Sequence, residues 1–258
     1  MKIFLLPFLS AVLFIFYYNT AFNKSAGDVE DAKAIPVLIY HAVVKDPLEE
    51  REIEISLDQF KKQMSFLKKN NYKTLTLDEF YDFIQGNKVF PSRSVLLTFD
   101  DGIKTNYTNV YPVLKKYDFT AAAFIITNSL DQQTSDFFLN KDELEKIKDV
   151  FEYASHTHNM HGQTAAGTPD LLVKPKEEII KDIKTSLKYV DKNYLAYPFG
   201  AYNKELIDIL KELNIKMAFT AKGGKAHPKD PVYEIDRIFI DKHITDEQFM
   251  QILGYKQN

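Results

Sequence analysis

The stretch SVLLTFDDG, residues 94–102, joins a buried strand to a pair of carboxylates. Its first six residues are largely apolar, which predicts a strand that is covered on both faces. Asp100 and Asp101 follow at the strand end, where burying two carboxylates is costly unless partners hold them. An Asp-Gly turn is the simpler interpretation of the pair. The apolar strand before it, and histidines elsewhere in the chain, favour a site in which one carboxylate binds a metal ion and the other acts as a base.

Short apolar runs alternate with amphipathic segments on both sides of this stretch. That order predicts an α/β fold in which helices wind around a parallel sheet. Seven candidate strands without a second core indicate barrel-like closure and a single folded domain. The strands are expected at 35–40, 94–99, 121–127, 151–155, 194–198, 216–221 and 233–240. Helices are expected after the caps Ser56, Thr76 and Thr245, with Gly86 ending the second, and at 105–117, 141–149, 176–192 and 203–213.

Polar residues stand where several of these strands end. His41 follows the first strand, Asp100 and Asp101 the second and His156 the fourth, while the fifth ends in Pro198-Phe199-Gly200. In a β/α barrel, the loops after the carboxyl ends of the strands meet on one face, where active sites lie. The sequence therefore predicts that these four segments form one site.

Three of the six histidines lie within the stretch ASHTHNMHG, residues 154–162. His156 and His158 would share a face if the strand continued. His156 and His161 fit no single helix or strand face, although a loop could bring them together, so spacing does not decide between the pairs. Two neutral imidazoles and one carboxylate, with a position left for water, form a catalytic zinc ligand set. A structural loop with surface histidines is the alternative.

Composition excludes several classes of site. The chain has 258 residues, 45% of them apolar, and a net charge of -3 at pH 7, so nothing indicates a nucleic-acid partner. It has no cysteine, which excludes disulfides, thiolate metal sites and a lipid-modified N-terminal cysteine.

The N-terminal residues indicate export. Met1-Lys2 precedes the apolar run 3–18, the pattern of a signal peptide, although no good cleavage site follows. We expect 1–21 to be a signal peptide or an uncleaved membrane anchor, 22–34 a linker and 35–258 the folded domain. Either interpretation of 1–21 predicts a protein outside the cytoplasm. It would be secreted or held at the outer face of the membrane, with membrane or cell-wall association.

The ordered set of TFDDG, a histidine pair after a later strand, and YPFG at 197–200 resembles the polysaccharide deacetylases of carbohydrate esterase family 4. These proteins share the NodB-homology domain. The resemblance covers about residues 35–253 and implies a distorted (β/α)7 barrel. It implies hydrolysis of the amide bond in a polysaccharide that contains N-acetylglucosamine. It also implies a divalent metal ion, with Zn²⁺ expected and Co²⁺, Ni²⁺ or Mn²⁺ as alternatives.

The family pattern also implies roles for matching positions. Asp100 resembles the catalytic base and Asp101 a metal ligand. The five-residue step from His156 to His161 is like that of the branch that deacetylates poly-β-1,6-N-acetylglucosamine in biofilms, which makes these two histidines the expected ligands. His158 would then line the substrate groove or remain merely solvated.

Two departures from the usual pattern bear on the catalytic groups. The last predicted strand carries no good match to the family's general-acid histidine. The biofilm branch is permuted and has this histidine on the first strand after a tyrosine, so Tyr40-His41 makes His41 the expected acid in place of a core residue. Ala196 stands where the family often has an arginine that holds the base. Arg237 is the expected substitute partner for Asp100.

The remaining expectations concern the substrate. The backbone N–H near Phe199, with Pro198, is expected to hold the oxyanion, and Tyr107, Tyr197 and Tyr202 are candidates for a sugar-binding groove. The histidine step and the early Tyr40-His41 favour poly-β-1,6-N-acetylglucosamine over peptidoglycan, chitin oligomers or xylan. A non-catalytic carbohydrate-binding relic of the fold is the alternative from another class.

Overall fold

The computed structural model describes residues 30–131 and 135–255. The predicted signal peptide or anchor at 1–21, and most of the predicted linker at 22–34, lie outside the described residues. Within the described ranges, none of the helices has the length and apolar character needed to cross a bilayer.

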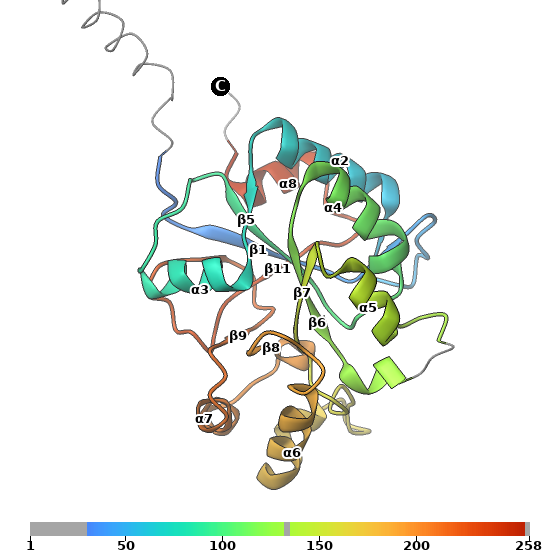
Figure 1. Cartoon of the computed structure of the whole chain (residues 1–258), viewed down its shortest axis with the longest axis vertical. Helices are drawn as coiled ribbons and strands as arrows, with labels where there is room; N and C mark the ends of the chain where they lie inside the picture. The colour runs from blue at the N-terminus through green and yellow to red at the C-terminus, as the bar shows by residue number, and fades with distance from the viewer. Residues whose placement is uncertain (1–29, 132–134, 256–258) are drawn as a thin grey trace, which may run out of the picture. The chain divides into compact units, whose positions relative to one another are not determined.

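Six parallel strands form a sheet in the order β1, β5, β6, β7, β8, β9 (Figure 1). Their bounds are Ile35–Tyr40, Ser94–Phe99, Ala121–Ile125, Phe151–Ser155, Tyr194–Ala196 and Met217–Phe219. Their residues are almost all buried, because helices cover one side of the sheet and an apolar core fills the other. Two short strands lie beside them: β4 (Lys73–Thr74) runs parallel to β5, and β10 (Lys225–Ala226) runs antiparallel to β1.

The sheet curls because the segment 235–239 lies between its first and last strands. Ile235 pairs in parallel with Phe219 of β9, and β11 (Ile238–Phe239) pairs in parallel with β1. The predicted α/β class and its barrel-like curvature are confirmed. The predicted strand 233–240 is wrong in extent, because this segment passes from pairing with β9 to pairing with β1 within a few residues.

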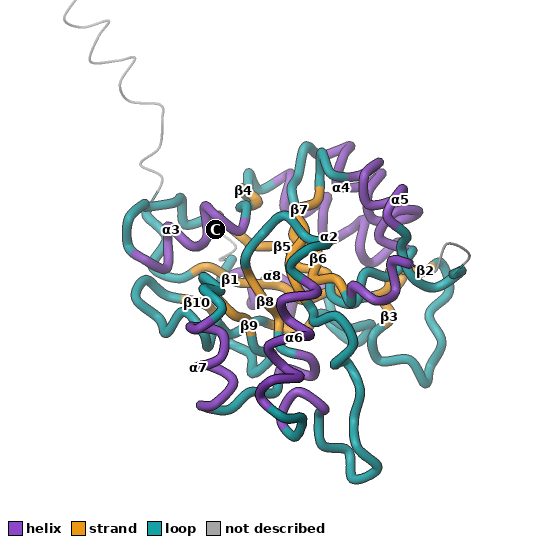
Figure 2. The backbone as a smooth tube through the Cα atoms, turned by 60° about the horizontal axis from the view of Figure 1, so that its bottom comes forward, coloured by secondary structure: helices purple, strands orange, loops and turns teal. Residues whose placement is uncertain are grey.

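The curled sheet separates an inner core from two outer ones. Alternate strand residues such as Val37, Leu96 and Phe124 face inward, where α3 (Leu77–Gln85) adds Phe80 and Phe83. One outer core lies under α2 (Leu57–Lys69), α4 (Tyr111–Tyr117), α5 (Lys141–Ile147) and α8 (Asp246–Leu253). The other lies under α6 (Lys176–Ser186) and α7 (Lys204–Glu212), which lie near each other beside β8 and β9 in Figure 2.

Local sequence signals locate most helix ends. Ser56 caps α2, and Thr76 forms a capping box with Glu79 at the start of α3. Gly86 ends α3 with φ 68°, a left-handed conformation that glycine adopts without steric cost. Thr245 caps α8 in the same way as Thr76 caps α3. These caps confirm the predicted starts of three helices.

The differences from prediction have local causes. The predicted helix 105–117 begins as a π-helix, Asn106–Val110, which ends two residues before Pro112, whose missing N–H removes one helical hydrogen bond. The predicted helix 176–192 ends as α6 at Ser186, after which tighter i→i+3 bonds continue the chain. Sequence analysis missed the small parallel pair β2 (Ala42–Val44) and β3 (Glu54–Ser56), whose strands are too short to show periodicity.

Candidate active site

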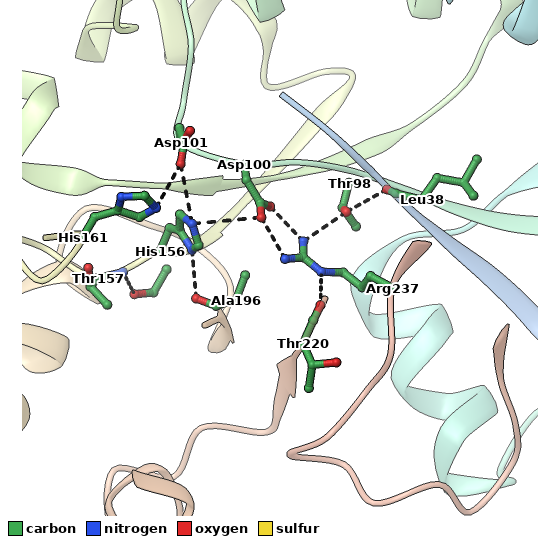
Figure 3. Close-up of polar contacts among 11 residues, drawn as sticks. Leu38, Thr98, Asp100, Asp101, His156, Thr157, His161, Ala196, Thr220 and Arg237 are labelled. Carbon is green, nitrogen blue, oxygen red and sulfur yellow. Dashed lines mark hydrogen bonds and ion pairs between the residues drawn. The ribbon is translucent and has the colours of Figure 1, made fainter. Parts of the chain in front are cut away.

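The carboxyl ends of β1, β5 and β7 bring the predicted residues to one face of the sheet. His41 directly follows β1, Asp100 and Asp101 follow β5, and His156 follows β7. Figure 3 shows the carboxylate of Asp101 facing both His156 and His161, with Asp100 alongside. The strand-end rule therefore located the site from sequence.

Asp100 is held by a bidentate ion pair. Arg237 donates from Nη1 to Oδ1 at 2.8 Å and from Nη2 to Oδ2 at 2.7 Å (Figure 3). Asp100 itself is buried, and its backbone N–H donates to the Tyr40 carbonyl at 3.0 Å. Burial alone raises the pKa of this carboxyl, but the Arg237 guanidinium outweighs burial and holds the pKa well below its usual range. Asp100 is therefore ionised at neutral pH.

Arg237 is 1% exposed and has partners along its whole guanidinium. Nε donates to the Thr220 carbonyl at 3.0 Å, and Nη1 also reaches the Thr98 hydroxyl at 3.2 Å. The rings of Phe124 and Phe219 lie 5.2 and 5.8 Å from its central carbon. The expected contact between Arg237 and Asp100 is present. The sequence analysis missed Thr98. The only sign of its role in the sequence is a hydroxyl-bearing residue at an inward-facing position of an otherwise apolar strand.

Asp101 points away from Asp100 and towards the histidines. Its backbone is left-handed, with φ 72°, which lets neighbouring carboxylates face different partners. Oδ1 lies 3.5 Å from His156 Nε2 and 3.4 Å from His161 Nε2. That oxygen is buried and has no hydrogen-bond partner within the described residues. Burial, with the neighbouring charge of Asp100, raises the pKa of Asp101 to about 6.

The two histidines present neutral nitrogens to Asp101. His156 Nδ1 lies 2.8 Å from the Ala196 carbonyl, which can only accept, so this nitrogen carries the proton and Nε2 keeps its lone pair. Burial lowers the pKa of His156 to about 3 and also lowers the pKa of His161. Neutral imidazole is the form that binds metal ions.

The residue types fit a metal ion. One ligand atom from each of Asp101, His156 and His161 lies within 4.8 Å of the others. A buried carboxylate oxygen without a partner, next to two imidazole lone pairs, is the donor set of a catalytic zinc site. Of the two histidine pairs that spacing left open, the structure brings together His156 and His161.

His158 contacts other residues. Its Nδ1 lies 2.9 Å from the Thr127 hydroxyl, and its ring stacks on Tyr189 at 5.7 Å between centroids. These contacts point its ring to the outside of the loop, whereas His156 and His161 point towards Asp101.

His41 is half-buried, with its ring 5.4 Å from that of Phe239 on β11. Its Nδ1 is buried, and the part of the chain that the structure describes offers it no hydrogen bond. Val43, two residues later, donates to the Thr105 hydroxyl at 3.1 Å and accepts from Asn109 Nδ2 at 2.7 Å. Two residues of the segment after Asp101 thus hold β2, the strand that follows His41, by hydrogen bonds. No sequence motif indicated this contact.

The PFG turn lies beside the histidine loop. Pro198–Gly200 forms one 3-10 turn in which Phe199 has φ 59°. Phe199 is 49% exposed, and its ring lies 4.7 Å from that of His161. A Cβ at Gly200 would come within 2.9 Å of the Ala221 backbone nitrogen, so only glycine fits. Phe199 therefore forms part of the exposed edge of the site.

The three candidate groove tyrosines differ in exposure. Tyr197 is fully buried and donates to the Tyr233 carbonyl at 3.0 Å, so its proposed place in a groove is wrong. Tyr202 stacks on Tyr197 and donates to Glu234 at 2.6 Å. Tyr107 is half-buried and packs against the outer core.

Known proteins similar to this chain are deacetylases. The sequence profile described as polysaccharide deacetylase matches residues 87–218, a range that holds Asp100, Asp101, His156 and His161 but neither His41 nor Arg237. The poly-beta-1,6-N-acetyl-D-glucosamine N-deacetylase of Staphylococcus aureus (strain MRSA252) is 34% identical over 216 residues, covering 79% of this chain and 72% of that protein. The protein of the same name from Staphylococcus epidermidis (strain ATCC 35984) is 33% identical, covering 100% of this chain and 99% of that protein.

Solved structures of deacetylases share the fold. The Streptococcus pyogenes deacetylase PplD in complex with acetate superposes with a TM-score of 0.77 at 28% identity, covering 85% of this chain and 98% of that one. IcaB from Ammonifex degensii superposes with a TM-score of 0.74 at 21% identity, covering 87% and 97%. The second likeness concerns the fold alone.

Proposed function

The chain belongs to the polysaccharide deacetylase family and is a hydrolase of amide bonds, and on that premise we propose that it removes N-acetyl groups from poly-β-1,6-N-acetylglucosamine outside the cell. The observation that carries the proposal is the meeting of Asp101, His156 and His161 beside the pair of Asp100 and Arg237. The choice of polymer rests on the staphylococcal relatives, one of which aligns with the whole chain.

Asp101, His156 and His161 would hold a divalent metal ion, for which we propose Zn²⁺, with Co²⁺, Ni²⁺ or Mn²⁺ as alternatives. When bound, such an ion lowers the pKa of a bound water and polarises a carbonyl group. The protein holds its ligands ready for this, because Ala196 fixes the tautomer of His156 and burial keeps both imidazoles neutral.

Asp100 would act as the general base. It is ionised, and its Oδ2 lies 4.0 Å from His156 Nε2, close enough to take a proton from a water attacking the acetyl carbon. The Arg237 contact that keeps Asp100 ionised also makes it a weak base. We therefore assign to Arg237 the task of orienting the carboxylate as well as charging it.

His41 would act as the general acid. As the bond between the acetyl carbon and the nitrogen breaks, His41 would donate a proton to the leaving amine, so that the products are acetate and a free amino sugar. The backbone N–H of Phe199, with Pro198 before it, would stabilise the negative charge on the carbonyl oxygen. The exposed Phe199 ring would pack against the sugar ring.

Two features bear on the polymer. The mildly acidic chain suits a neutral substrate that becomes cationic as acetyl groups leave. The early Tyr40-His41 supports the β-1,6 polymer over peptidoglycan, chitin or xylan. The step from His156 to His161, which was expected to favour the same polymer, does not distinguish these substrates, because HTHNMH also fits H-[ST]-x-x-x-H, the general motif of the family.

The proposed location rests on the sequence. Apolar residues 3–18 after Lys2 support export, with the domain secreted or anchored at the outer face of the membrane. Fractionation of cells that express the full chain tests this. A chain confined to the cytoplasmic fraction would contradict the location without touching the chemistry.

The test of function is acetate release from defined oligomers. The purified full chain is stripped of metal, reloaded with Zn²⁺, and assayed on β-1,6-linked and β-1,4-linked N-acetylglucosamine oligomers. Asp100→Asn and His41→Ala should each lower the rate by about 10²–10⁴-fold. His227→Ala, which changes an exposed loop histidine, is the matched control and should keep full activity.

Each outcome separates the alternatives. Metal-dependent release from the β-1,6 oligomer, lost in both variants, would support the proposal. Release mainly from β-1,4 oligomers would keep the mechanism and move the substrate towards chitin or peptidoglycan. Metal binding without release from any oligomer would favour a carbohydrate-binding relic.

A further inference from the structure

Asp182 contacts the loop between the two proposed histidine ligands. One oxygen of its carboxylate accepts the backbone N–H of His158 at 2.8 Å, and the other accepts that of Asn159 at 2.7 Å. A single carboxylate therefore binds two successive amides midway between His156 and His161. Hydrogen bonds to an ionised acceptor are about twice as strong as neutral ones.

The other two amides of the loop are also bonded to side chains. Thr157 N–H donates to the Ser155 hydroxyl at 3.1 Å, and Met160 N–H donates to the Thr157 hydroxyl at 3.3 Å. The hydroxyl oxygen of Ser155 in turn lies 2.5 Å from that of Ser186. All four backbone donors between the ligands are thus fixed, and Thr157 has the left-handed φ of 71° that reverses the chain.

The opposite side of the loop is fixed through its carbonyls. Thr127 N–H donates to the Thr157 carbonyl and Asn128 N–H to the His158 carbonyl, each at 3.1 Å. Asn128 Nδ2 also donates to Asn159 Oδ1 at 2.7 Å. The segment after β6 and the helix α6 therefore hold the loop from two sides, and Asp182 supplies the contact from α6 to its middle.

The position of Asp182 is costly for the helix that carries it. Asp182 is only 8% exposed, and burial raises the pKa of its carboxyl despite the two amide donors. On the same face of α6, Ile179 and Ile183 pack into the core that also holds Met160 of the loop. A surface position would avoid the desolvation cost, so we attribute the buried carboxylate to the loop contact that it makes.

We propose that Asp182 is a positioning residue whose carboxylate holds the loop in the shape that lets His156 and His161 reach one metal ion. The inference rests on the metal site of the proposed function. Its consequence is geometric: without Asp182, two amides lose their acceptors and the loop is free to move His161 away from Asp101. Residues that support metal ligands in this way typically contribute 10–100-fold to metal affinity.

The experiment compares Asp182→Asn with Glu178→Gln in the full chain. Asparagine keeps the shape of the side chain but offers one acceptor to two N–H donors. Glu178 is an exposed acid one turn earlier on α6, so its variant controls for the loss of charge on the same helix. Zn²⁺ affinity is measured by competition with a chromophoric chelator, and acetate release is measured at limiting and at saturating Zn²⁺.

We expect Asp182→Asn to weaken Zn²⁺ binding by about 10–100-fold. At limiting metal its rate should fall in proportion, whereas saturating metal should restore much of kcat and leave KM unchanged. The metal-free melting temperature is compared as well. Rescue by added metal marks a positioning role, because a variant that only loosened the fold would keep its metal affinity whenever folded.

Equal Zn²⁺ affinity in Asp182→Asn and Glu178→Gln would overturn the inference and leave the proposed function standing. If Asp182→Asn is too unstable to purify, Asp182→Glu replaces it. That variant keeps the charge but displaces the oxygens, and wild-type affinity in it would likewise overturn the inference. A wild-type chain that binds no metal would overturn the proposed metal site together with this inference.

Discussion

Asp100 and Arg237 lie 137 positions apart in the chain, yet they form a bidentate ion pair at the centre of the site. The pair is buried, so each charge is stabilised by the other and not by water. Removing one member of a buried pair costs about 3–5 kcal/mol, because the remaining charge is left in an apolar surrounding. This dependence makes Arg237 a test of both stability and chemistry.

We predict that Arg237→Met raises the pKa of Asp100, because the strongest of the groups that oppose the effect of burial is then gone. In the wild type the depressed pKa gives a stabilisation that is present above the unfolded pKa of about 4 and is lost as pH falls through the folded value. The variant should be about 3–5 kcal/mol less stable at pH 7 in urea unfolding. Its deacetylation rate should fall, and the acidic limb of its pH profile should move to higher pH.

The double variant Asp100→Asn/Arg237→Met is the control for this prediction. Because it removes both charges, it should be more stable than Arg237→Met alone, although it remains inactive. If the acidic limb of the pH–rate profile were the same in Arg237→Met as in the wild type, Arg237 would not set the pKa of Asp100.

Asp101 is expected to lower the stability of the metal-free protein. Burial raises its pKa to about 6, so ionisation costs the folded state free energy once pH exceeds the unfolded pKa of about 4. That cost grows until about pH 6 and persists above it. Asp101→Asn should therefore stabilise the metal-free protein at pH 7 by about 1–3 kcal/mol, while it weakens Zn²⁺ binding.

Calorimetry of the metal-free proteins checks this expectation, with about 2–4 °C expected for each kcal/mol. Asp118→Asn is the matched control, because Asp118 also has a left-handed backbone, with φ 56°, but is exposed. A lower melting temperature for Asp101→Asn than for Asp118→Asn would contradict the expectation that ionised Asp101 destabilises the metal-free protein.

Among the elements, the π-helix Asn106–Val110 links two parts of the site. It begins five residues after Asp101. Thr105, which precedes it, and Asn109 within it hold Val43 on β2, two residues after His41. The segment that follows the proposed base, Asp100, is therefore hydrogen-bonded to the strand that follows the proposed acid, His41. π-Helical turns often occur at functional sites, and this one places Asn109 against β2.

We predict that Asn109→Ala displaces His41 and lowers kcat with little change in KM. Loss of one hydrogen bond should cost about 0.5–1.5 kcal/mol of stability. A displacement near 1 Å at the acid can cost up to about 10²-fold in rate. Steady-state kinetics beside urea unfolding measure both effects. Thr108→Ala, at an exposed position of the same π-helix, should change neither, and equal kinetics in the two variants would refute the link.

At the level of the whole molecule, the curled sheet brings four strand ends together and closes around Arg237. The segment 235–239 completes the curl between β9 and β1 and carries Arg237 into the inner core. The sheet and the site therefore depend on the same segment. A metal ion that binds only this arrangement should stabilise the entire fold.

We predict that Zn²⁺ raises the melting temperature of the full chain. At a free concentration of about 100 times Kd the gain is about 2.7 kcal/mol, or roughly 5–10 °C for a domain of this size. His161→Ala should lose the rise, whereas His158→Ala should keep it, because His158 contacts Thr127 and Tyr189 instead of Asp101. A rise lost in His158→Ala and kept in His161→Ala would reverse the choice of ligand.

The sequence by itself determined the class of fold, the starts of most helices and strands, and the face that holds the candidate site. These follow from local physics: apolar runs set the strands, caps such as Ser56 and Thr76 set the helix starts, and polar residues mark the carboxyl ends of the strands. Its signals stopped where strands were short, as in β2, β3 and β11, because two or three residues cannot show a period.

Only the tertiary structure decided which side chains meet. The loop path selects His161 over His158, the curl of the sheet brings Arg237 to Asp100, and α6 supplies Asp182 to the histidine loop. Sequence spacing is silent on these contacts, because each joins segments whose distance in space depends on how the whole sheet closes. The resemblance to a family suggested partners, but the curl of the backbone brought them within bonding distance.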